Sequence, residues 1–244
     1  MAGTSSLDLE AQSRALEGRA PDEILGWAAE HFAPHIVFTT GFGVEGCVLI
    51  DLIARARLPI TVLTLDTGVF FPETYALWRQ LEERYSMEIR AVLPKQTLDE
   101  QAATHGPALW ERDPDLCCRL RKIEPLAEAM AGRKAWVSAI RRDQTSDRGQ
   151  ANVLEHDKRF GIIKVNPLLS WTESDVWTFA RANDVPFNPL HERGYPSIGC
   201  APCTTPVQPG EDPRAGRWRG RTKTECGLHE RARLPIVPRH KEDS

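Results

Sequence analysis

The residues best suited to chemistry in this chain of 244 residues are its six cysteines, four of which form two pairs. Cys117 and Cys118 are adjacent, and Cys200 and Cys203 follow about eighty residues later as a Cys-x-x-Cys turn. Such a turn lets two thiolates face one metal centre, and four thiolates from two sources suit a tetrahedral zinc ion or an iron–sulfur cluster. All four are therefore candidate metal ligands.

The adjacent pair makes a demand on the backbone, because successive side chains diverge on a helix or a strand. Cys117 and Cys118 can share one centre only at a bent or fraying helix end, and Pro114 is placed to start that helix. The adjacent pair therefore favours an iron–sulfur cluster over structural zinc. Buried free thiols are a third alternative. Lys122, four residues after Cys118, either offsets the charge of a thiolate-bound cluster or is an ordinary solvated lysine.

A further cysteine, Cys226, lies near the C-terminus in the stretch Lys223-Thr-Glu-Cys-Gly-Leu-His229. Its cationic neighbours favour a thiolate, and Gly227 leaves room for a close approach. The surrounding region from Arg214 to Lys241 is basic, which suits a small anionic ligand better than a duplex. Cys226 is thus a candidate nucleophile.

A strand, a glycine-rich turn and a helix follow one another in the first third of the chain. Residues 35–40 predict the strand, residues 41–46 the turn, and residues 47–53 a helix in which Cys47 is expected to be a buried thiol. This arrangement binds phosphate through backbone N–H groups and the helix N-terminus. The turn is not a Walker motif, since no Gly-Lys-Ser/Thr follows. Its candidate phosphate ligands are Thr40, Gly41, Phe42 and Gly43.

Two further predicted strands end in polar loops, where open α/β sheets bind their ligands. Residues 59–65 run into Asp66, which either contacts a ligand or caps its own turn. Residues 135–140 run into Arg141 and Arg142, and arginines at a strand end can hold phosphate and sulfate oxygens in paired hydrogen bonds. Of these two arginines, we favour Arg142 as the substrate contact, with Arg141 as the alternative that the sequence leaves open.

The alternation of strands and helices predicts an α/β fold with a single doubly wound, mostly parallel sheet. Further strands are expected at residues 88–93 and 160–167, and helices at residues 74–85, 98–104, 117–131 and 171–177. We divide the chain into a helical N-terminal lead-in (1–34), a nucleotide-binding domain that carries the cysteine pairs (35–205), and a mobile C-terminal tail that carries Cys226 (206–244).

The composition of the chain limits its expected binding partners and its cellular location. The net charge of −3 gives no pull toward nucleic acid or membranes, and no run of eighteen apolar residues predicts a membrane span. The N-terminus lacks an apolar signal core, so we expect a cytoplasmic protein in which cysteines are ligands or catalysts rather than disulfides. The sequence leaves the oligomeric state open, a homo-oligomer included.

Three motifs in this order carry a family resemblance: Cys117-Cys118-Arg-Leu-Arg-Lys122, Cys200-x-x-Cys203, and the Cys226 stretch. Together they resemble the assimilatory adenylyl-sulfate (APS) reductases, relatives of the phosphoadenylyl-sulfate (PAPS) reductases. The resemblance runs from about Phe38 to His229. The chain departs from the family's phosphate loop at Thr39-Thr40, where a serine is commoner, but it keeps a hydroxyl.

The resemblance implies an adenine nucleotide alpha hydrolase-like fold and one [4Fe-4S] cluster held by Cys117, Cys118, Cys200 and Cys203. It makes Cys226 the nucleophile that attacks the sulfur of APS, so that AMP leaves and an S-sulfocysteine forms. Reduced thioredoxin, or glutaredoxin, then releases sulfite. The implied substrate contacts are the glycine-rich turn (Thr40, Gly41, Phe42, Gly43), the backbone near Leu65, and Asp66, Lys122, Arg142, Arg214, Arg217 and His229.

Three rivals stay open. A PAPS reductase shares the tail but typically lacks the cluster cysteines. An ATP-pyrophosphatase-type enzyme, such as a sulfate adenylyltransferase subunit or a tRNA thiolase, resembles the phosphate loop but has no place for Cys226. A zinc-stabilised nucleotide-binding module would bind nucleotide without catalysis.

Overall fold

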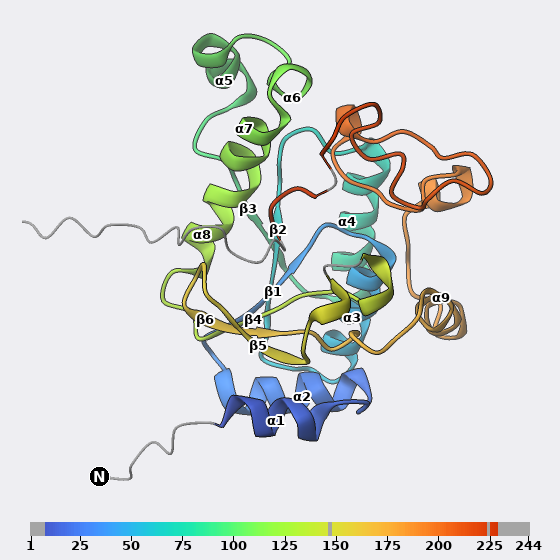
Figure 1. The fold of residues 1–244 in the computed structure, drawn as a ribbon. Coiled ribbons are helices and arrows are strands. Elements are labelled where there is room, and N and C mark those ends of the chain that lie inside the picture. Colours follow the sequence, from blue (N-terminus) through green and yellow to red (C-terminus); the bar gives the residue numbers. More distant parts are fainter. Residues whose placement is uncertain (1–7, 146–147, 224, 229–244) are drawn as a thin grey trace, which may run out of the picture.

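The polar loops after two neighbouring parallel strands meet at one edge of a six-stranded sheet. The computed structural model describes residues 8–145, 148–223 and 225–228 (Figure 1). The strands are β1 (Ile36–Thr40), β2 (Thr61–Leu65), β3 (Ile89–Val92), β4 (Ala135–Val137), β5 (Leu154–Asp157) and β6 (Ile162–Val165), in the order β3-β2-β1-β4-β6-β5. All neighbours pair in parallel except β5 and β6. The order reverses between β1 and β4, where such sheets bind ligands.

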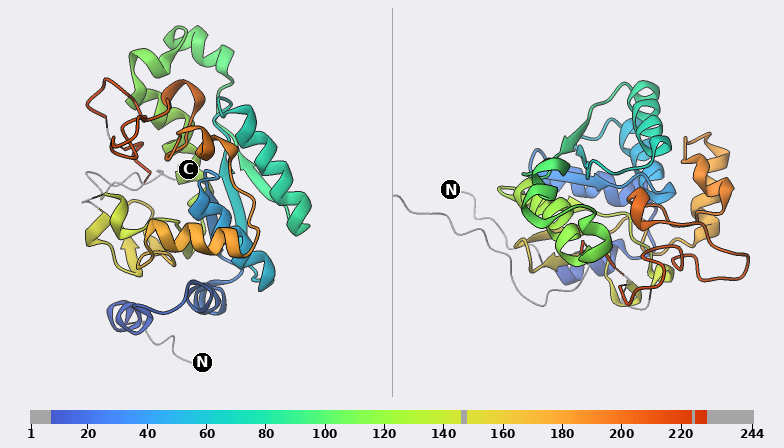
Figure 2. Two further views of the ribbon diagram at one scale, coloured as in Figure 1. Left: turned by 90° about the vertical axis from the view of Figure 1, so that its right-hand side faces the viewer. Right: turned by 90° about the horizontal axis from the view of Figure 1, so that it is seen from above.

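Helices cover both faces of the sheet (Figure 2), as the alternation of side chains along β1 requires. Ile36 and Phe38 belong to a core that also takes in α2, α3, α4 and α9, whereas Val37 belongs to a second core with α8. This confirms the doubly wound α/β fold. The helices are α1 (Leu9–Leu16), α2 (Pro21–Phe32), α3 (Val44–Arg55), α4 (Pro72–Tyr85), α5 (Leu98–His105), α6 (Leu109–Arg112), α7 (Pro114–Cys118), α8 (Glu124–Met130) and α9 (Glu173–Ala182).

Local sequence signals explain several helix starts. Thr172 accepts a hydrogen bond from the backbone N–H of Asp175, and the Asp175 carboxylate accepts from Thr172 in return, a capping box that the sequence predicted. Pro114 is the first residue of α7, where its missing N–H costs nothing.

The edge strand β5 was not predicted. Its sequence Leu-Glu-His-Asp has neither a β-branched run nor strict alternation. The strand forms because it pairs with β6 on one side and because α1 protects its other side, where the Leu154 N–H donates to the Ser13 hydroxyl over 3.1 Å. The N-terminal helices α1 and α2 lie below the strands in Figure 1, away from residues 201–223. No helix within the described ranges is long and apolar enough to span a membrane.

Candidate active site

A cavity of about 340 Å³ opens where the loops after β1 and β4 meet. The glycine-rich turn and the start of α3 form one wall, and the loop after β4 forms a second. Residues 196–198 and 212–217 close it from the C-terminal side. Its lining residues are Thr39, Thr40, Gly41, Gly43, Val44, Glu45, Gly46, Ala139, Ile140, Arg141, Asp143, Gln144, Arg148, Glu173, Trp177, His191, Pro196, Ser197, Ile198, Asp212, Pro213, Arg214 and Arg217.

The glycine-rich turn is shaped by its own side chains. The Thr40 hydroxyl accepts a hydrogen bond from the Phe42 N–H over 3.0 Å. Phe42 has a φ of +60° and is fully buried, with its ring 5.7 Å from that of Trp78, so its side chain anchors the turn in the core. A Cβ on Gly46 would lie 2.5 Å from the Thr40 hydroxyl, which explains the glycine. The N-terminus of α3, capped by Gly43, thereby lies at the cavity.

Arg141 is the arginine of the β4 loop that lines the cavity. It is 5% exposed and forms ion pairs with Glu45 and, over 2.9 Å, with Asp143. Gln144 donates a further hydrogen bond of 2.9 Å to Glu45. The carboxylates hold the guanidinium in place at the end of β4.

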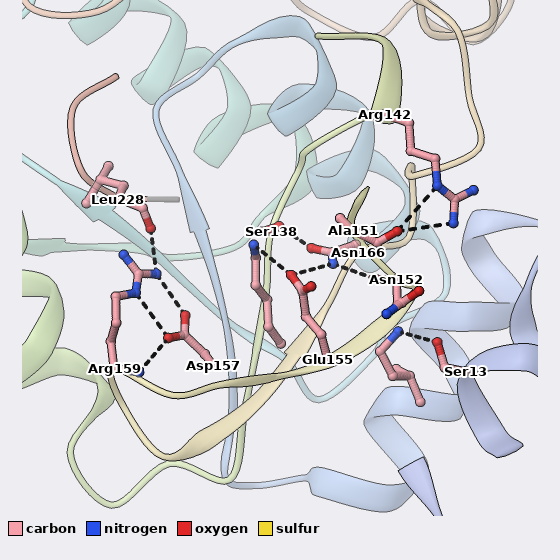
Figure 3. A network of polar contacts seen from close by, with 12 residues as sticks. Ser13, Ser138, Arg142, Ala151, Asn152, Glu155, Asp157, Arg159, Asn166 and Leu228 are labelled. Atoms are coloured by element: carbon pink, nitrogen blue, oxygen red, sulfur yellow. Dashed lines mark hydrogen bonds and ion pairs between the residues drawn. The ribbon is translucent and has the colours of Figure 1, made fainter. Parts of the chain in front are cut away.

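Arg142 points away from this cavity, which corrects our expectation that it contacts the substrate. Its guanidinium donates to both carboxylate oxygens of Glu17 over 2.6 and 2.9 Å. It also donates to the Ala151 carbonyl over 3.3 Å, as Figure 3 shows. The hydrogen bond from Arg142 lowers the pKa of Glu17. The physical reason is that consecutive residues after a strand point to opposite sides, so only one of the two arginines can face the ligand edge.

Three more arginines converge on the cavity from distant segments: Arg148, Arg214 and Arg217. Glu225 bridges the first two, with ion pairs of 3.1 Å to each. Arg217 packs over the Trp218 ring at 4.7 Å, and a Cβ on Gly199 would collide with its guanidinium. Together they give the cavity a wall suited to an anion.

The four paired cysteines line a second, smaller space beside this cavity. Helix α7 ends at Cys118 and passes into a single π-helical turn, Arg119–Ile123, before α8 begins. This change of helical geometry supplies the bend that adjacent cysteines need to face one centre, and π turns of this kind often mark functional sites. Cys200 lies opposite, with its Sγ 3.3 Å from the Thr67 hydroxyl.

This donor set fits a four-thiolate cluster. Cys117, Cys118, Cys200 and Cys203 all line one space. In an iron–sulfur cluster, each cysteine binds its own iron, so the thiols surround a space rather than converge on a point. Two buried cations adjoin the space: Arg121, which donates to the Thr67 carbonyl over 2.6 Å, and Lys122.

Lys122 is 8% exposed and lines the cysteine space, not the larger cavity. Burial opposes its charge, but the negative charge of the Cys200, Cys226 and Cys118 thiolates outweighs burial and raises the pKa of Lys122. Lys122 is therefore a buried cation between the paired cysteines and Cys226, as a charge-balancing role requires.

Cys226 is half-buried, and it is close enough to Lys122, Cys118, Arg148 and Arg217 to interact with them electrostatically. The tail thus brings the candidate nucleophile to the boundary between the cysteine space and the arginine wall. His229, the last expected contact, lies outside the described residues.

Leu65 and Asp66 do not line the cavity. The Leu65 side chain packs in the core beside α8, which leaves only its backbone for a ligand. Asp66 accepts hydrogen bonds from the Gly68 N–H over 2.9 Å and from the Tyr75 hydroxyl over 2.8 Å. Burial, and then the bond to Asp66, raise the pKa of Tyr75 to about 12. Asp66 therefore caps its own turn, one of the two roles that its sequence allowed.

Comparison with known proteins decides the family. Residues 35–206 match the family model described as "Phosphoadenosine phosphosulfate reductase domain". The chain belongs to this reductase family. The match includes the glycine-rich turn, the β4 loop and both cysteine pairs, and it stops before the Cys226 segment.

Relatives and solved structures extend the match. An adenosine 5'-phosphosulfate reductase 1 of Bacillus subtilis is 49% identical over 208 residues, which cover 85% of this chain and 89% of that protein. The corresponding reductase of Oceanobacillus iheyensis is 48% identical and covers 87% and 89%. The crystal structure of a PAPS reductase from Candida auris, in a phosphate complex, is 33% identical, has a TM-score of 0.74 and covers 84% of this chain and 99% of that one. An FMN adenylyltransferase of Candida glabrata bound to ATP, 18% identical with a TM-score of 0.56, covers 92% and 78% and shares the fold alone.

Sequence reasoning missed several residues of this reductase site. Arg148 follows the β4 loop and could have been proposed from its charge beside the Arg-Arg-Asp-Gln motif, whereas Glu45 and Glu225 act as partners of arginines that only the fold brings close. His191 lines the cavity from a loop with no motif of its own, and burial lowers its pKa to about 4.

Proposed function

We propose that this protein reduces APS to sulfite and AMP in assimilatory sulfate reduction, with reduced thioredoxin as the electron donor. The observation that carries the proposal is the position of Cys226, between a cavity with four lining arginines and a space lined by four cysteines. The relatives that are 48–49% identical over most of the chain are named adenosine 5'-phosphosulfate reductases, which supports the substrate.

In the first step, the Cys226 thiolate attacks the sulfur of APS. A bond forms between Cys226 Sγ and that sulfur, the bond from sulfur to the phosphate oxygen breaks, and its electron pair leaves with AMP. Arg141, Arg148, Arg214 and Arg217 line the cavity and can hold the departing phosphate as its negative charge grows. The N-terminus of α3 and the glycine-rich turn add backbone N–H donors.

The second step returns the enzyme to its starting state. A thioredoxin thiolate attacks Cys226 Sγ, and sulfite leaves with the electron pair of the S–S bond. The second thioredoxin thiol then resolves the mixed disulfide, which frees Cys226 and leaves thioredoxin oxidised. Cys226 is partly exposed, which supports attack by an external protein.

We propose one [4Fe-4S] cluster as the cofactor, bound by Cys117, Cys118, Cys200 and Cys203. Such a cluster would supply a fixed charge and a structural link between α7 and the Cys-x-x-Cys turn, with no change of oxidation state needed. Lys122 is buried between these cysteines and Cys226. Its positive charge would offset the negative charge of the cluster and would also attract the sulfate end of the substrate.

We propose that the protein works in the cytoplasm, since all six cysteines are free of disulfides in the structure.

The second candidate function is that of a PAPS reductase that carries a cluster, and the similarity to the Candida auris enzyme supports it. The identity between the two chains is lower, 33% against 49% for the named APS reductases, which favours APS.

Turnover with each nucleotide tests this function. The purified holoenzyme with thioredoxin should form sulfite from APS at least about tenfold faster than from PAPS, a preference of roughly 1.4 kcal/mol in the transition state. Cys226→Ser should abolish sulfite formation. Cys47→Ala, a matched change at a fully buried thiol of α3, should retain it. Faster turnover of PAPS would establish the second candidate, and turnover by Cys226→Ser would exclude the mechanism.

An anaerobic visible spectrum with iron and sulfide analysis tests the cofactor. A broad absorption band at about 400 nm and about four irons per chain are expected. One zinc per chain and no colour would instead favour the zinc-stabilised module.

A further inference from the structure

The turn between β5 and β6 holds an arginine that the reaction scheme does not use. Arg159 is 9% exposed, and its backbone N–H and Nε both donate to Asp157 Oδ1, over 3.0 and 3.1 Å. Its Nη2 donates to Asp157 Oδ2 over 2.8 Å. The guanidinium also lies 4.9 Å from the centre of the Phe160 ring. The side chain is therefore fixed by its own turn.

The other edge of this guanidinium forms hydrogen bonds with the segment that contains Cys226. Arg159 Nη1 donates to the Gly227 carbonyl over 2.8 Å. Its Nη2 donates to the Leu228 carbonyl over 2.7 Å, as Figure 3 shows. These two carbonyls follow directly after Cys226 in the chain. The turn that holds Arg159 lies almost seventy residues upstream, so the contact is made only by the fold.

Packing contacts with Ile123 and with the core beside α8 also hold this segment in place. Gly227 has a φ of +83°, and a Cβ there would lie 2.7 Å from Ile123 Cδ1, at the end of the π-helical turn. The Leu228 side chain packs on the core beside α8. Backbone conformation, close approach and packing thus all fit one docked position of residues 226–228.

We propose that Arg159, held by Asp157, is the positioning residue that docks the Cys226–Leu228 segment for attack on the substrate. It touches neither the cavity nor the paired cysteines, and it acts by fixing the two carbonyls after Cys226. The kinetic part of this inference rests on the proposed function. Docking serves the first step, in which Cys226 must lie at the bound sulfur. The second step needs no docked segment, because thioredoxin must reach Cys226 from outside.

The test is a single-turnover experiment on two half-reactions. Arg159→Lys keeps a cation beside Asp157 but loses the planar fork that reaches two carbonyls. At saturating radiolabelled APS, this variant should form S-sulfocysteine roughly 10- to 100-fold more slowly than wild type, as expected for the loss of one or two charge-assisted hydrogen bonds. Release of sulfite by thioredoxin from the preformed intermediate should stay within about twofold.

A second variant separates positioning from folding. Asp157→Asn combined with Arg159→Met removes both charges, so no buried ion is left unpaired, and the melting temperature should stay close to wild type. It should show the same first-step defect. Arg193→Lys is the matched control, because the Arg193 side chain is exposed and its ion pair of 3.0 Å with Glu73 involves no residue of the Cys226–Leu228 segment.

A readout without APS keeps the two proposals distinct. Iodoacetamide should alkylate Cys226 severalfold faster in both Arg159 variants than in wild type or Arg193→Lys, since an undocked segment exposes the thiol. If wild type fails to turn over APS but the alkylation rates differ, the proposed function fails and the docking role stands. The docking role would be overturned if wild type and both variants had equal rates of Cys226 alkylation and equal rates of S-sulfocysteine formation. It would also be overturned if the variants slowed S-sulfocysteine formation and sulfite release by the same factor.

Discussion

The contrast between Arg141 and Arg142 gives the sharpest prediction, because these neighbours have the same chemistry and opposite positions. We expect Arg141→Met to lose most APS turnover and Arg142→Met to keep it. Arg141 is 5% exposed and lines the cavity. Under the proposed function, it donates at least one charge-assisted hydrogen bond to a phosphate or sulfate oxygen of the substrate, and the substitution would delete that bond. At about 1.5–3 kcal/mol for each bond, kcat/KM should fall roughly 10- to 150-fold.

The stability effects should also differ between the two variants. The Arg142 and Glu17 side chains are 34% and 42% exposed, so their ion pair is worth about 1 kcal/mol or less of unfolding free energy. Arg142→Met should therefore lower stability slightly and change kcat/KM less than about threefold. Arg141→Met removes the ion pair of the partly buried Glu45 carboxylate but leaves its hydrogen bond from Gln144, which should cost roughly 1–3 kcal/mol.

The assay is steady-state sulfite formation with thioredoxin, next to urea unfolding of each variant. A double variant, Glu45→Gln with Arg141→Met, removes the unpaired carboxylate. It should recover stability but not activity, which separates a folding defect from a lost substrate contact. The reasoning would be refuted if Arg142→Met lost activity while Arg141→Met retained it.

Four further outcomes follow from the structure. Burial lowers the pKa of His191 to about 4, below its ordinary 6.5, so the unfolded chain takes up the proton first and stability falls as the pH drops below about 6.5. Between pH 7 and pH 5, this should cost about 2 kcal/mol in urea unfolding, and His191→Gln should remove that part. Cys200→Ser should remove most of the visible absorption of the anaerobically purified protein, and unchanged colour would contradict its role as a ligand. Cys47 is fully buried, and burial raises the pKa of its thiol, so mass spectrometry after brief alkylation should find Cys226 labelled and Cys47 unlabelled. Gly46→Ala should weaken AMP binding measured by calorimetry, because its Cβ would lie 2.5 Å from the Thr40 hydroxyl that shapes the turn.

Much of the fold could be predicted because its elements carry local signals. The run from Ile36 to Thr40 and the capping box at Thr172 each identify an element without reference to the rest of the chain. Strand β5 carries no such signal, since its formation depends on pairing with β6 and on cover from α1. Most helices and strands can be predicted from neighbouring residues, whereas an edge strand such as β5 depends on tertiary contacts.

The site shows the same division. The cysteines were identifiable from residue type and spacing, and the need for a bent helix was clear, but the π-helical turn after Cys118 that meets this need could not be read from the sequence. The sequence favoured Arg142 over Arg141, but which of the two lines the cavity depends on the carboxylate that each one pairs with: Glu45 at the cavity for Arg141, and Glu17, just after α1, for Arg142. Such partners are distant in sequence, and only the packed structure brings them together.

The measurement that tests the central claim most directly is the capture of the sulfur on Cys226. The reduced holoenzyme is mixed with one equivalent of radiolabelled APS in the absence of thioredoxin, and the digested protein is mapped. The account predicts one AMP released per labelled enzyme, the label on the peptide that contains Cys226, and its release as sulfite on addition of reduced thioredoxin. Free sulfite without thioredoxin, or label on a peptide that lacks Cys226, would contradict the account.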